Sequence, residues 1–340
     1  MITRTMALMS LLTVCLCAFA QDKKLKTGLY PEDWKYTLAP GVTSKETVYY
    51  SDGIACYAKM FYPKGFPAEG KTPGVVLGQG WAGTHFSIEK YGARFAEKGL
   101  VAMVIDYRGW GASDGFPTIA GGAGRVGGDQ HRDDKRYTEM KADVVIKRTR
   151  LLPMKQVEDY RNAISYLQGE PGVNPDLIGV WGSSYAGGDS VVVAGLDARV
   201  KAVAVQVPAV GSATGPAAPF KLQGKLLEDA IKRARSGQGG EFETGYSYKR
   251  MIDVETQQAG AEFNPMNFVN AIGTRPVILI VAEKDELINN AKSPHVFYEA
   301  LTGPKDYIEV PGVSHFEMYV NDAFERSSSA AGDWFVKYLK

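Results

Sequence analysis

The stretch that most constrains the fold of this chain is residues 177–195, where an apolar run meets a turn of small residues and a helix-compatible segment. Residues 177–181 read Leu-Ile-Gly-Val-Trp and have strand character, and Gly-Ser-Ser-Tyr-Ala follows at 182–186. A strand that turns into a helix within so few residues exposes the turn residue above the edge of a sheet and strains its backbone. The pattern predicts an α/β fold that presents a serine hydroxyl at that edge.

Two serines are adjacent in this turn, and the small residues around them favour Ser184 as the candidate nucleophile. Gly182 precedes Ser184 by two residues and Ala186 follows it by two, so both cramped positions hold small side chains. If Ser183 were the exposed residue, Trp181 would occupy the first of those positions. Small residues between a strand and a helix are also common in α/β proteins generally, so the interpretation depends on partner residues elsewhere.

Apolar runs alternate with helical patterns along the rest of the chain. Strands are expected at residues 45–50 and 54–62 (a hairpin), 74–77, 101–107, 177–181, 200–207, 276–282 and 307–310. Helices are expected at residues 88–98, 157–167, 293–301 and 323–339. Strands that alternate with helices imply a mainly parallel central sheet covered by helices on both faces.

Two insertions, residues 112–153 and 208–274, interrupt the alternation, and we expect them to lie over the strand ends, where α/β proteins bind ligands. The glycine-rich run at 121–128 has no Gly-Lys-Ser/Thr and no strand directly before it, so it fits neither a phosphate loop nor a dinucleotide site. We interpret it as a flexible loop, and residues 222–235 as a charged helix. Three aromatic residues of the second insertion are candidates for lining a substrate pocket: Phe220, Tyr246 and Tyr248.

A serine hydroxyl becomes a good nucleophile when a base removes its proton and a carboxylate orients that base. The four histidines of the chain are His85, His131, His295 and His315. His315 lies in a loop after the last expected strand and before the last helix, which opens at the same sheet edge as Ser184. We therefore expect His315 to be the base.

The acid is expected in the turn after the strand at 276–282. Asp285 lies three residues past that strand, and Glu283 and Glu286 are alternatives in the same turn. We favour Asp285, because its short side chain can reach a histidine with little rotamer freedom. The order serine, acid, histidine along the chain is the one that this arrangement requires.

Two backbone N–H groups are expected to form an oxyanion hole. One belongs to Tyr185, directly after Ser184. The second is assigned to Trp81, with Ala82 as the alternative, in the glycine-rich loop at 78–84. The same glycines could instead make only a tight turn, with Trp81 as a core residue.

The first 20 residues predict a secretory signal peptide: a lone Arg4, an apolar run at 6–19 and small residues before the polar Gln21. The run is shorter than the roughly 20 residues that span a membrane. A lipoprotein signal would use Cys15 or Cys17, but the residues before them, Val14 and Leu16, are larger than that processing usually accepts. We expect an exported protein, periplasmic or secreted, with one domain at 21–340 and no stable membrane span after cleavage.

The composition predicts neither a strongly charged partner nor an intramolecular disulfide. Thirty-nine basic and 38 acidic residues give a formal charge of +1, which argues against nucleic acid or anionic membrane as a partner. Cleavage after Ala20 leaves Cys56 as the only cysteine, so an intramolecular disulfide cannot form. Cys56 lies in an alternating strand, where a buried, inert thiol is expected.

With these landmarks in this order, residues from about 45 to 340 resemble an α/β hydrolase. The residues that carry the resemblance are Gly-Gln-Gly-Trp (78–81), Asp-Tyr-Arg-Gly-Trp-Gly-Ala-Ser-Asp-Gly (106–115), Gly-Ser-Ser-Tyr-Ala-Gly-Gly (182–188), Asp285 and His315. Within the superfamily the chain is similar to dienelactone-hydrolase-like and prolyl-peptidase-like bacterial enzymes. Two departures are Gln79, where many relatives have His, and Ala186, where they have Gly; Gln79 could retune the substrate side.

The resemblance implies an exported serine hydrolase that cleaves a small carboxylic ester through an acyl-enzyme, with no metal and no cofactor. The alternatives are a peptidase or amidase acting on short peptides, and a non-catalytic binding protein on a hydrolase scaffold. A dehalogenase is disfavoured, because it needs a carboxylate nucleophile where Ser184 stands.

Overall fold

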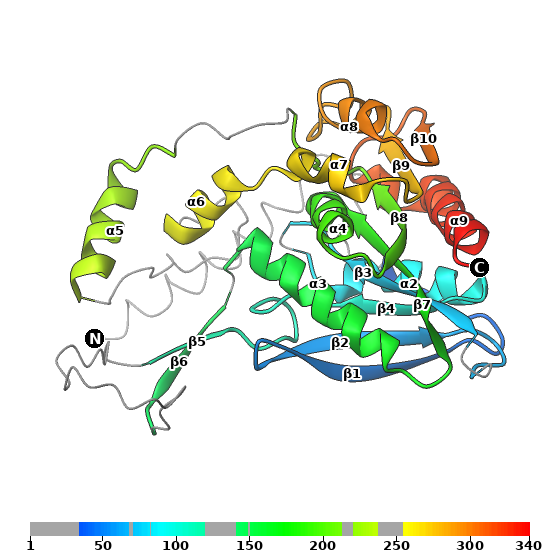
Figure 1. Ribbon diagram of the computed structural model, residues 1–340, viewed down its shortest axis with the longest axis horizontal. Helices are drawn as coiled ribbons and strands as arrows, with labels where there is room; N and C mark the ends of the chain where they lie inside the picture. Colours follow the sequence, from blue (N-terminus) through cyan, green and yellow to red (C-terminus); the bar gives the residue numbers. More distant parts are fainter. Residues whose placement is uncertain are drawn as a thin grey trace, which may run out of the picture.

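A computed structural model describes residues 34–67, 71–81, 83–119, 141–148, 150–212, 220–236 and 254–340. Its centre is an eight-stranded sheet with the order β1-β2-β4-β3-β7-β8-β9-β10 (Figure 1). The strands are β1 (Thr43–Ser51), β2 (Ile54–Tyr62), β3 (Thr72–Gly78), β4 (Val101–Ile105), β7 (Val173–Ser183), β8 (Val200–Gln206), β9 (Val277–Ala282) and β10 (Lys305–Val310).

The sheet is mainly parallel, as the sequence predicts. β1 and β2 form the expected antiparallel hairpin, and β2 also pairs antiparallel with β4. Every other neighbouring pair of the sheet is parallel. β7 lies between β3 and β8, so the turn that follows it opens near the middle of the sheet edge.

Helices cover both faces of the sheet (Figure 1). One face packs against α3 (Pro153–Gln168), α4 (Tyr185–Leu196), α7 (Val269–Ile272) and α8 (Pro294–Ala300). The other packs against α2 (Glu89–Glu97) and α9 (Asn321–Tyr338). In β4, Met103 faces the first core whereas Ala102 and Val104 face the second, because successive side chains of a strand point to opposite faces. Both faces of the sheet are therefore buried, and its strands read as continuous apolar runs.

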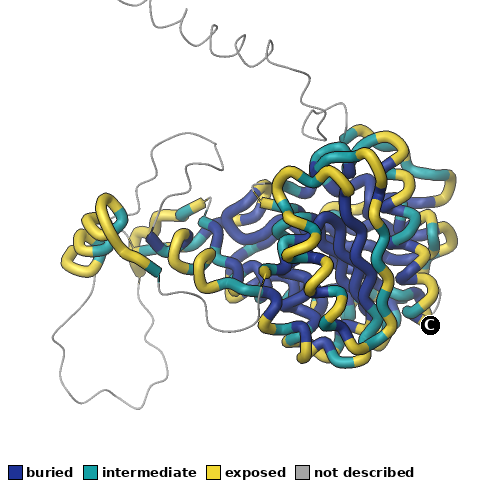
Figure 2. Tube along the Cα trace, turned by 90° about the horizontal axis from the view of Figure 1, so that it is seen from above, coloured by how far each residue is buried: buried dark blue, intermediate teal, exposed yellow. Residues whose placement is uncertain are grey.

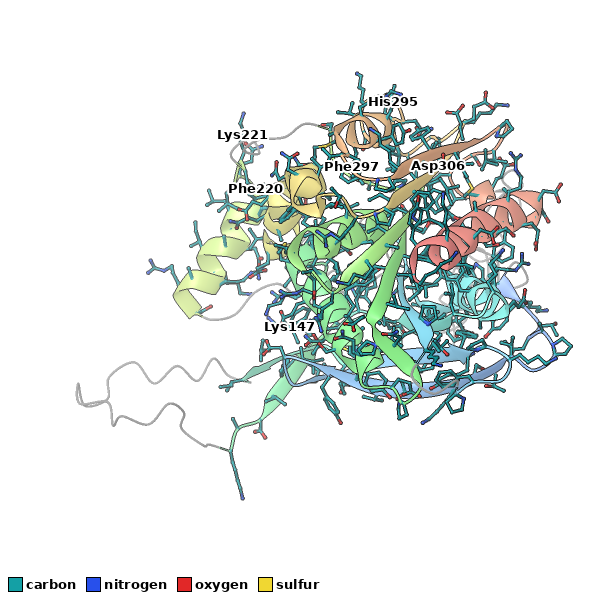
Figure 3. All side chains as sticks on the ribbon, turned by 45° about the vertical axis from the view of Figure 1, so that its right-hand side comes forward. Lys147, Phe220, Lys221, His295, Phe297 and Asp306 are labelled. Carbon is teal, nitrogen blue, oxygen red and sulfur yellow. The ribbon has the colours of Figure 1, made fainter. Side chains whose placement is uncertain are left out.

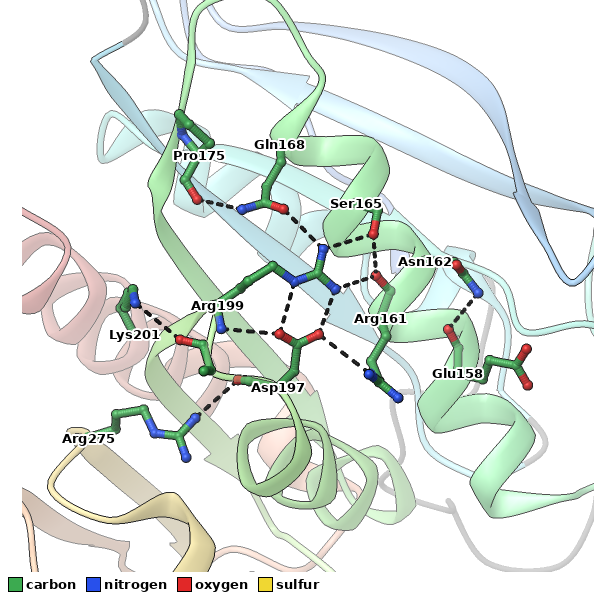
Figure 4. Close-up of polar contacts among 11 residues, drawn as sticks. Glu158, Arg161, Asn162, Ser165, Gln168, Pro175, Asp197, Arg199, Lys201 and Arg275 are labelled. Carbon is green, nitrogen blue, oxygen red and sulfur yellow. Dashed lines mark hydrogen bonds and ion pairs between the residues drawn. The ribbon is translucent and has the colours of Figure 1, made fainter.

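An arginine network joins α3 to the turn between α4 and β8 (Figure 4). The Arg199 guanidinium donates to both carboxylate oxygens of Asp197, at 2.9 and 2.6 Å, and also to Ser165 and Gln168 of α3. Partial burial raises the pKa of Asp197, but the hydrogen bonds from Arg199 outweigh it and hold that pKa below its usual value. The network fixes the far end of α4, the helix that begins at the predicted nucleophile.

The described parts of the two insertions lie beside the body of the protein (Figures 1 and 2). The first forms a small hairpin of β5 (Phe116–Ile119) and β6 (Val144–Lys147). The second contributes α5 (Lys225–Ser236), which matches the expected charged helix, and α6 (Val254–Glu262). α5 has no buried residue. The predicted signal peptide, the glycine-rich run at 121–128 and both Tyr246 and Tyr248 lie outside the described residues.

Among the described residues, the other elements that have bounds are the short 3-10 helices η2 (His85–Ser87), η5 (Pro265–Phe268) and η6 (Glu317–Tyr319). η2 follows the loop after β3, and η6 follows the loop after β10. In the part of the chain that the structure describes, no helix has both the length and the apolar character needed to cross a membrane.

Candidate active site

Ser184 occupies a sharp turn between β7 and α4 with a backbone conformation that non-glycine residues rarely adopt. Its φ is 57° and its ψ is −119°. The Ser184 N–H donates to the carbonyl of Gln206 at the end of β8, at 2.8 Å, and its carbonyl accepts from Ala209 at 2.9 Å. A side chain at Gly182 would overlap the carbonyl of Ala186, so the turn can form only with glycine there. The conformation of the turn is therefore fixed by hydrogen bonds to the end of β8 and the segment after it, and by the close packing of Gly182 against Ala186.

Ser184, His315 and Asp285 lie in one hydrogen-bonded chain. His315 Nε2 is 3.0 Å from Ser184 Oγ, and His315 Nδ1 is 2.8 Å from Asp285 Oδ2. The side chains of His315 and Asp285 are 1% and 0% exposed. The second oxygen of Asp285 accepts the N–H groups of Leu287 and Ile288, at 2.9 and 2.8 Å, so the carboxylate has a fixed orientation. Such an arrangement can hold the imidazole with its Nε2 toward the serine.

The two alternative acids contact the backbone of the histidine loop instead of the imidazole. Glu283 Oε2 accepts the N–H of Gly312 at 2.6 Å, and Glu286 Oε2 accepts the N–H of His315 at 2.9 Å. Of the three carboxylates in this turn, Asp285 is the one that reaches the ring.

The other histidines lie elsewhere. His85 is buried in η2, where its Nδ1 is 2.6 Å from Asp106 and its Nε2 is 3.6 Å from Glu89. His295 points outward from α8 with 56% of its side chain exposed (Figure 3). His131 lies outside the described residues.

The loop after β3 passes close to Ser184. A side chain at Gly80 would come within 3.1 Å of Ser184 Cβ, so glycine permits this approach. Trp81 is 39% exposed, which argues against its interpretation as a core residue, and its ring meets the Tyr185 ring edge-on at 5.6 Å. In the described part of the chain neither the Trp81 nor the Tyr185 N–H has an acceptor. Ala82, the alternative donor, lies outside the described residues.

Gln79, which departs from the family pattern in this loop, is held by Asp106. Its side chain is fully buried, and its amide donates to Asp106 Oδ1 at 3.3 Å. The same oxygen accepts the His85 N–H at 2.7 Å. Asp106 thus holds both ends of the loop that carries Trp81, which is a structural role for the first residue of the Asp-Tyr-Arg-Gly segment.

Arg108, the arginine of that segment, forms a buried ion pair with Asp159 of α3. Its Nε donates to Asp159 Oδ1 at 2.7 Å, its N–H donates to Oδ2 at 3.0 Å, and its Nη2 donates to Ser51 Oγ at 2.6 Å. Arg108 is 1% exposed and Asp159 is 0% exposed. The pair connects the loop after β4 to the helix that covers one face of the sheet.

Asp189, one helical turn after Tyr185, is a buried carboxyl that the sequence analysis did not single out. It is fully buried, and within the described residues neither carboxyl oxygen has a hydrogen-bond partner. Burial raises the pKa of Asp189 well above its usual value. An acidic residue in an otherwise small and apolar helix is the signal that could have drawn attention to it.

Comparisons with known proteins agree with this architecture. Residues 59–222 match the sequence model of the Dienelactone hydrolase family. The α/β hydrolase GrgF from Penicillium sp. sh18 has a similar structure, with a TM-score of 0.65 at 19% identity over 87% of this chain and 99% of that one. The chain has the α/β-hydrolase fold.

Two curated proteins are similar to this chain over most of their length. The "Quorum-quenching protein AidA" of Acinetobacter baumannii is 25% identical over 307 residues, which cover 81% of this chain and 89% of the relative. The "Thiohydrolase aneE" of Aspergillus aculeatus is 21% identical over 311 residues, which cover 81% and 86%. The match to the Dienelactone hydrolase family model supports an enzyme with hydrolase activity. Among the described residues, no group of three or more His, Cys, Asp or Glu side chains is placed to hold a metal ion.

Proposed function

We propose that this α/β hydrolase is an exported serine hydrolase that cleaves small carboxylic esters through an acyl-enzyme. The observation that carries the proposal is the hydrogen-bonded chain Ser184–His315–Asp285, with distances of 3.0 and 2.8 Å. Export rests on the signal-peptide pattern of residues 1–20.

In this mechanism Ser184 Oγ attacks the ester carbonyl while His315 Nε2 takes the hydroxyl proton. The ester oxygen becomes negatively charged, and the N–H groups of Trp81 and Tyr185 stabilise it. The C–O bond to the alcohol then breaks, and His315 gives its proton to the leaving alkoxide. Water attacks the acyl-enzyme by the same steps in reverse, which releases the acid and restores the Ser184 hydroxyl. Asp285 keeps the imidazole in the required tautomer and stabilises its protonated form.

An ester is favoured over an amide because an alcohol leaves more easily than an amine. Other acyl donors and acceptors are also candidates for this enzyme, because its relatives include proteins named as a thiohydrolase, a polyketide transferase and an acyltransferase. All of these activities are compatible with an acyl-enzyme at Ser184. A peptidase that acts on short peptides remains the main alternative, and a panel of matched ester, thioester and aminoacyl-amide substrates separates the three leaving groups.

The decisive test is the Ser184→Ala variant with a p-nitrophenyl ester as substrate. We expect turnover to fall to background, and we expect labelling by a fluorophosphonate probe to disappear, while the circular dichroism spectrum stays that of the wild type. Ser165→Ala, which changes an exposed serine of α3, is the matched control and should retain both activity and labelling. Undiminished turnover in Ser184→Ala would refute the proposal. If the wild type fails to react with the probe, the non-catalytic alternative gains support.

The assignment of the acid is tested by alanine variants of two carboxylates in the same turn, Asp285 and Glu283. We expect Asp285→Ala to lower kcat by roughly 10³- to 10⁴-fold, because the imidazole loses the group that fixes its tautomer. Glu283→Ala should stay within about tenfold of the wild type, since Glu283 contacts only the backbone of Gly312. A larger loss in Glu283→Ala than in Asp285→Ala would reverse the assignment.

A further inference from the structure

Ser183 and Ser184, the adjacent serines of the turn after β7, each contact a different residue of the same short segment. Ser184 Oγ is 3.0 Å from His315 Nε2. Ser183 Oγ is 2.5 Å from the hydroxyl of Tyr319, which ends η6, four residues after His315. Two parallel contacts therefore join the turn to the segment at 315–319.

The contact between Ser183 and Tyr319 lies in a buried polar network. Ser183 is fully buried, and its hydroxyl is 3.4 Å from both the carbonyl oxygen and the side-chain amide of Gln206. The Gln206 amide also donates to the Tyr91 hydroxyl of α2 at 2.9 Å. The Gln206 carbonyl is the group that accepts the N–H of Ser184. The network thus connects the backbone of the turn to the segment that carries the histidine.

Other polar contacts of the 315–319 segment join it to α2 and to the turn after β9, among them the hydrogen bond between His315 Nδ1 and Asp285. Its carbonyl at Tyr319 accepts the Lys90 ammonium at 2.5 Å, and its N–H at His315 binds Glu286. Both of these contacts hold the segment to α2 or to the turn after β9, not to β7. Burial raises the pKa of the Tyr319 hydroxyl, so this hydroxyl stays neutral and keeps its proton for the hydrogen bond.

The two contacts differ in what happens to them during a reaction. The proton of the Ser184 hydroxyl passes to His315 when Ser184 attacks, and His315 returns a proton to Ser184 when the acyl-enzyme is hydrolysed, so that contact breaks and re-forms on each cycle. The Ser183–Tyr319 hydrogen bond takes no part in the proton transfers and persists throughout. It can therefore keep the imidazole at a fixed distance from Ser184 while the catalytic contact is open.

We propose that Tyr319 and Ser183 are positioning residues that act as a pair, holding the His315 segment in register with the nucleophile turn through their shared hydrogen bond. This inference rests on the proposed function, because it assumes that Ser184 and His315 react. Neither residue contacts the reacting atoms. A displacement of about 1 Å between reacting groups can lower a rate by roughly 10²-fold, so loss of the pair is expected to affect the chemical step.

The test is a double-mutant cycle with Tyr319→Phe, Ser183→Ala and the double variant, measured by steady-state hydrolysis of a p-nitrophenyl ester. We expect each single variant to lower kcat by roughly 10- to 100-fold with KM within about twofold of the wild type. The double variant should be no slower than the slower single variant, because one hydrogen bond is lost in all three. The control cycle uses Thr47→Val and Tyr166→Phe, which remove a hydroxyl–hydroxyl contact of 2.7 Å between β1 and α3, and should leave kcat unchanged.

A second readout separates positioning from loss of fold. Labelling of Ser184 by a fluorophosphonate should slow in Tyr319→Phe in proportion to kcat, while the labelled fraction at the end point stays complete. A partly unfolded variant would instead show an incomplete end point with a normal rate constant, which would overturn the inference. Tyr319→Phe carries the test alone if Ser183→Ala does not fold.

The inference fails if Tyr319→Phe keeps the wild-type kcat, or if the losses of the two single variants multiply in the double variant. These outcomes are distinct from failure of the proposed function. In that case Ser184→Ala would retain turnover, whatever Tyr319→Phe does.

Discussion

Replacing Asp189 by asparagine should remove a pH-dependent loss of stability that the buried carboxyl causes. Asp189 faces the hydroxyl groups of Tyr107, Tyr160 and Tyr185 and the carboxylate of Asp159, and within the described residues its oxygens have no hydrogen-bond partner. Burial raises the pKa of each tyrosine, so the tyrosines stay neutral and cannot balance a negative charge. Desolvation raises the pKa of Asp189 most strongly, the nearby Tyr107 hydroxyl opposes that rise in part, and the charge of Asp159 adds to it.

The direction of the pH dependence follows from this raised pKa. Between the unfolded-state pKa of about 3.9 and the higher folded-state pKa, the carboxyl is protonated in the folded protein and ionised in the unfolded chain. The contribution of Asp189 to the free energy of unfolding is fully favourable below the unfolded-state pKa. It is lost as the pH rises toward the folded-state pKa. Each pH unit in that window lowers the free energy of unfolding by about 1.4 kcal/mol. The asparagine side chain of the variant would be neutral at every pH and would remove this slope. The pH-independent part of the change is on the order of 1 kcal/mol, since both side chains bury an unpaired polar group.

The assay is urea unfolding of Asp189→Asn and the wild type at several pH values between about 4 and 7, the window above the unfolded-state pKa. We expect the variant to gain stability over the wild type progressively as the pH rises. Ser190→Ala is the control. Ser190 follows Asp189 in α4, and its replacement removes a hydrogen bond to Tyr160 of α3 but no ionisable side chain. Its curve should run parallel to that of the wild type. If the Asp189→Asn curve is also parallel, the reasoning about the buried carboxyl is wrong.

Two further predictions concern stability and the turn. Arg108→Ala leaves the fully buried Asp159 carboxylate without its partner and should lower the free energy of unfolding by about 3–5 kcal/mol, as measured by urea unfolding; a loss below about 1 kcal/mol would contradict a buried ion pair. Gly182→Ala places a methyl group against the carbonyl of Ala186, so the turn must distort, and fluorophosphonate labelling should fall to near background; full labelling would show that the turn tolerates a side chain.

The sequence predicts the elements that an apolar pattern marks and the site residues that directly follow a strand. The mainly parallel sheet, the hairpin of β1 and β2 and the helices on both faces follow from apolar runs, and the structure confirms them. The structure also brings together Ser184, Asp285 and His315, each of which follows a strand of the same sheet. Their catalytic roles stay predictions that the variants above test.

The contacts that the sequence could not predict join side chains far apart in the chain. Ser183 and Tyr319 are separated by 136 positions, and no local pattern distinguishes Tyr319 from other tyrosines. The orientation of Gln79 depends on Asp106, which lies at the end of another strand. Such pairings are set by how the loops pack, and periodicity along one element carries no information about them.

The backbone at Ser184, with its φ of 57°, has a consequence for the evolution and engineering of this protein. A non-glycine residue in such a region costs on the order of 1–3 kcal/mol, and glycine would relieve most of that cost. A search for heat-resistant variants that ignored turnover would therefore tend to select Ser184→Gly and discard the hydroxyl. At this position a gain in thermal stability would come with a loss of activity, so a search for stabilised variants has to measure both.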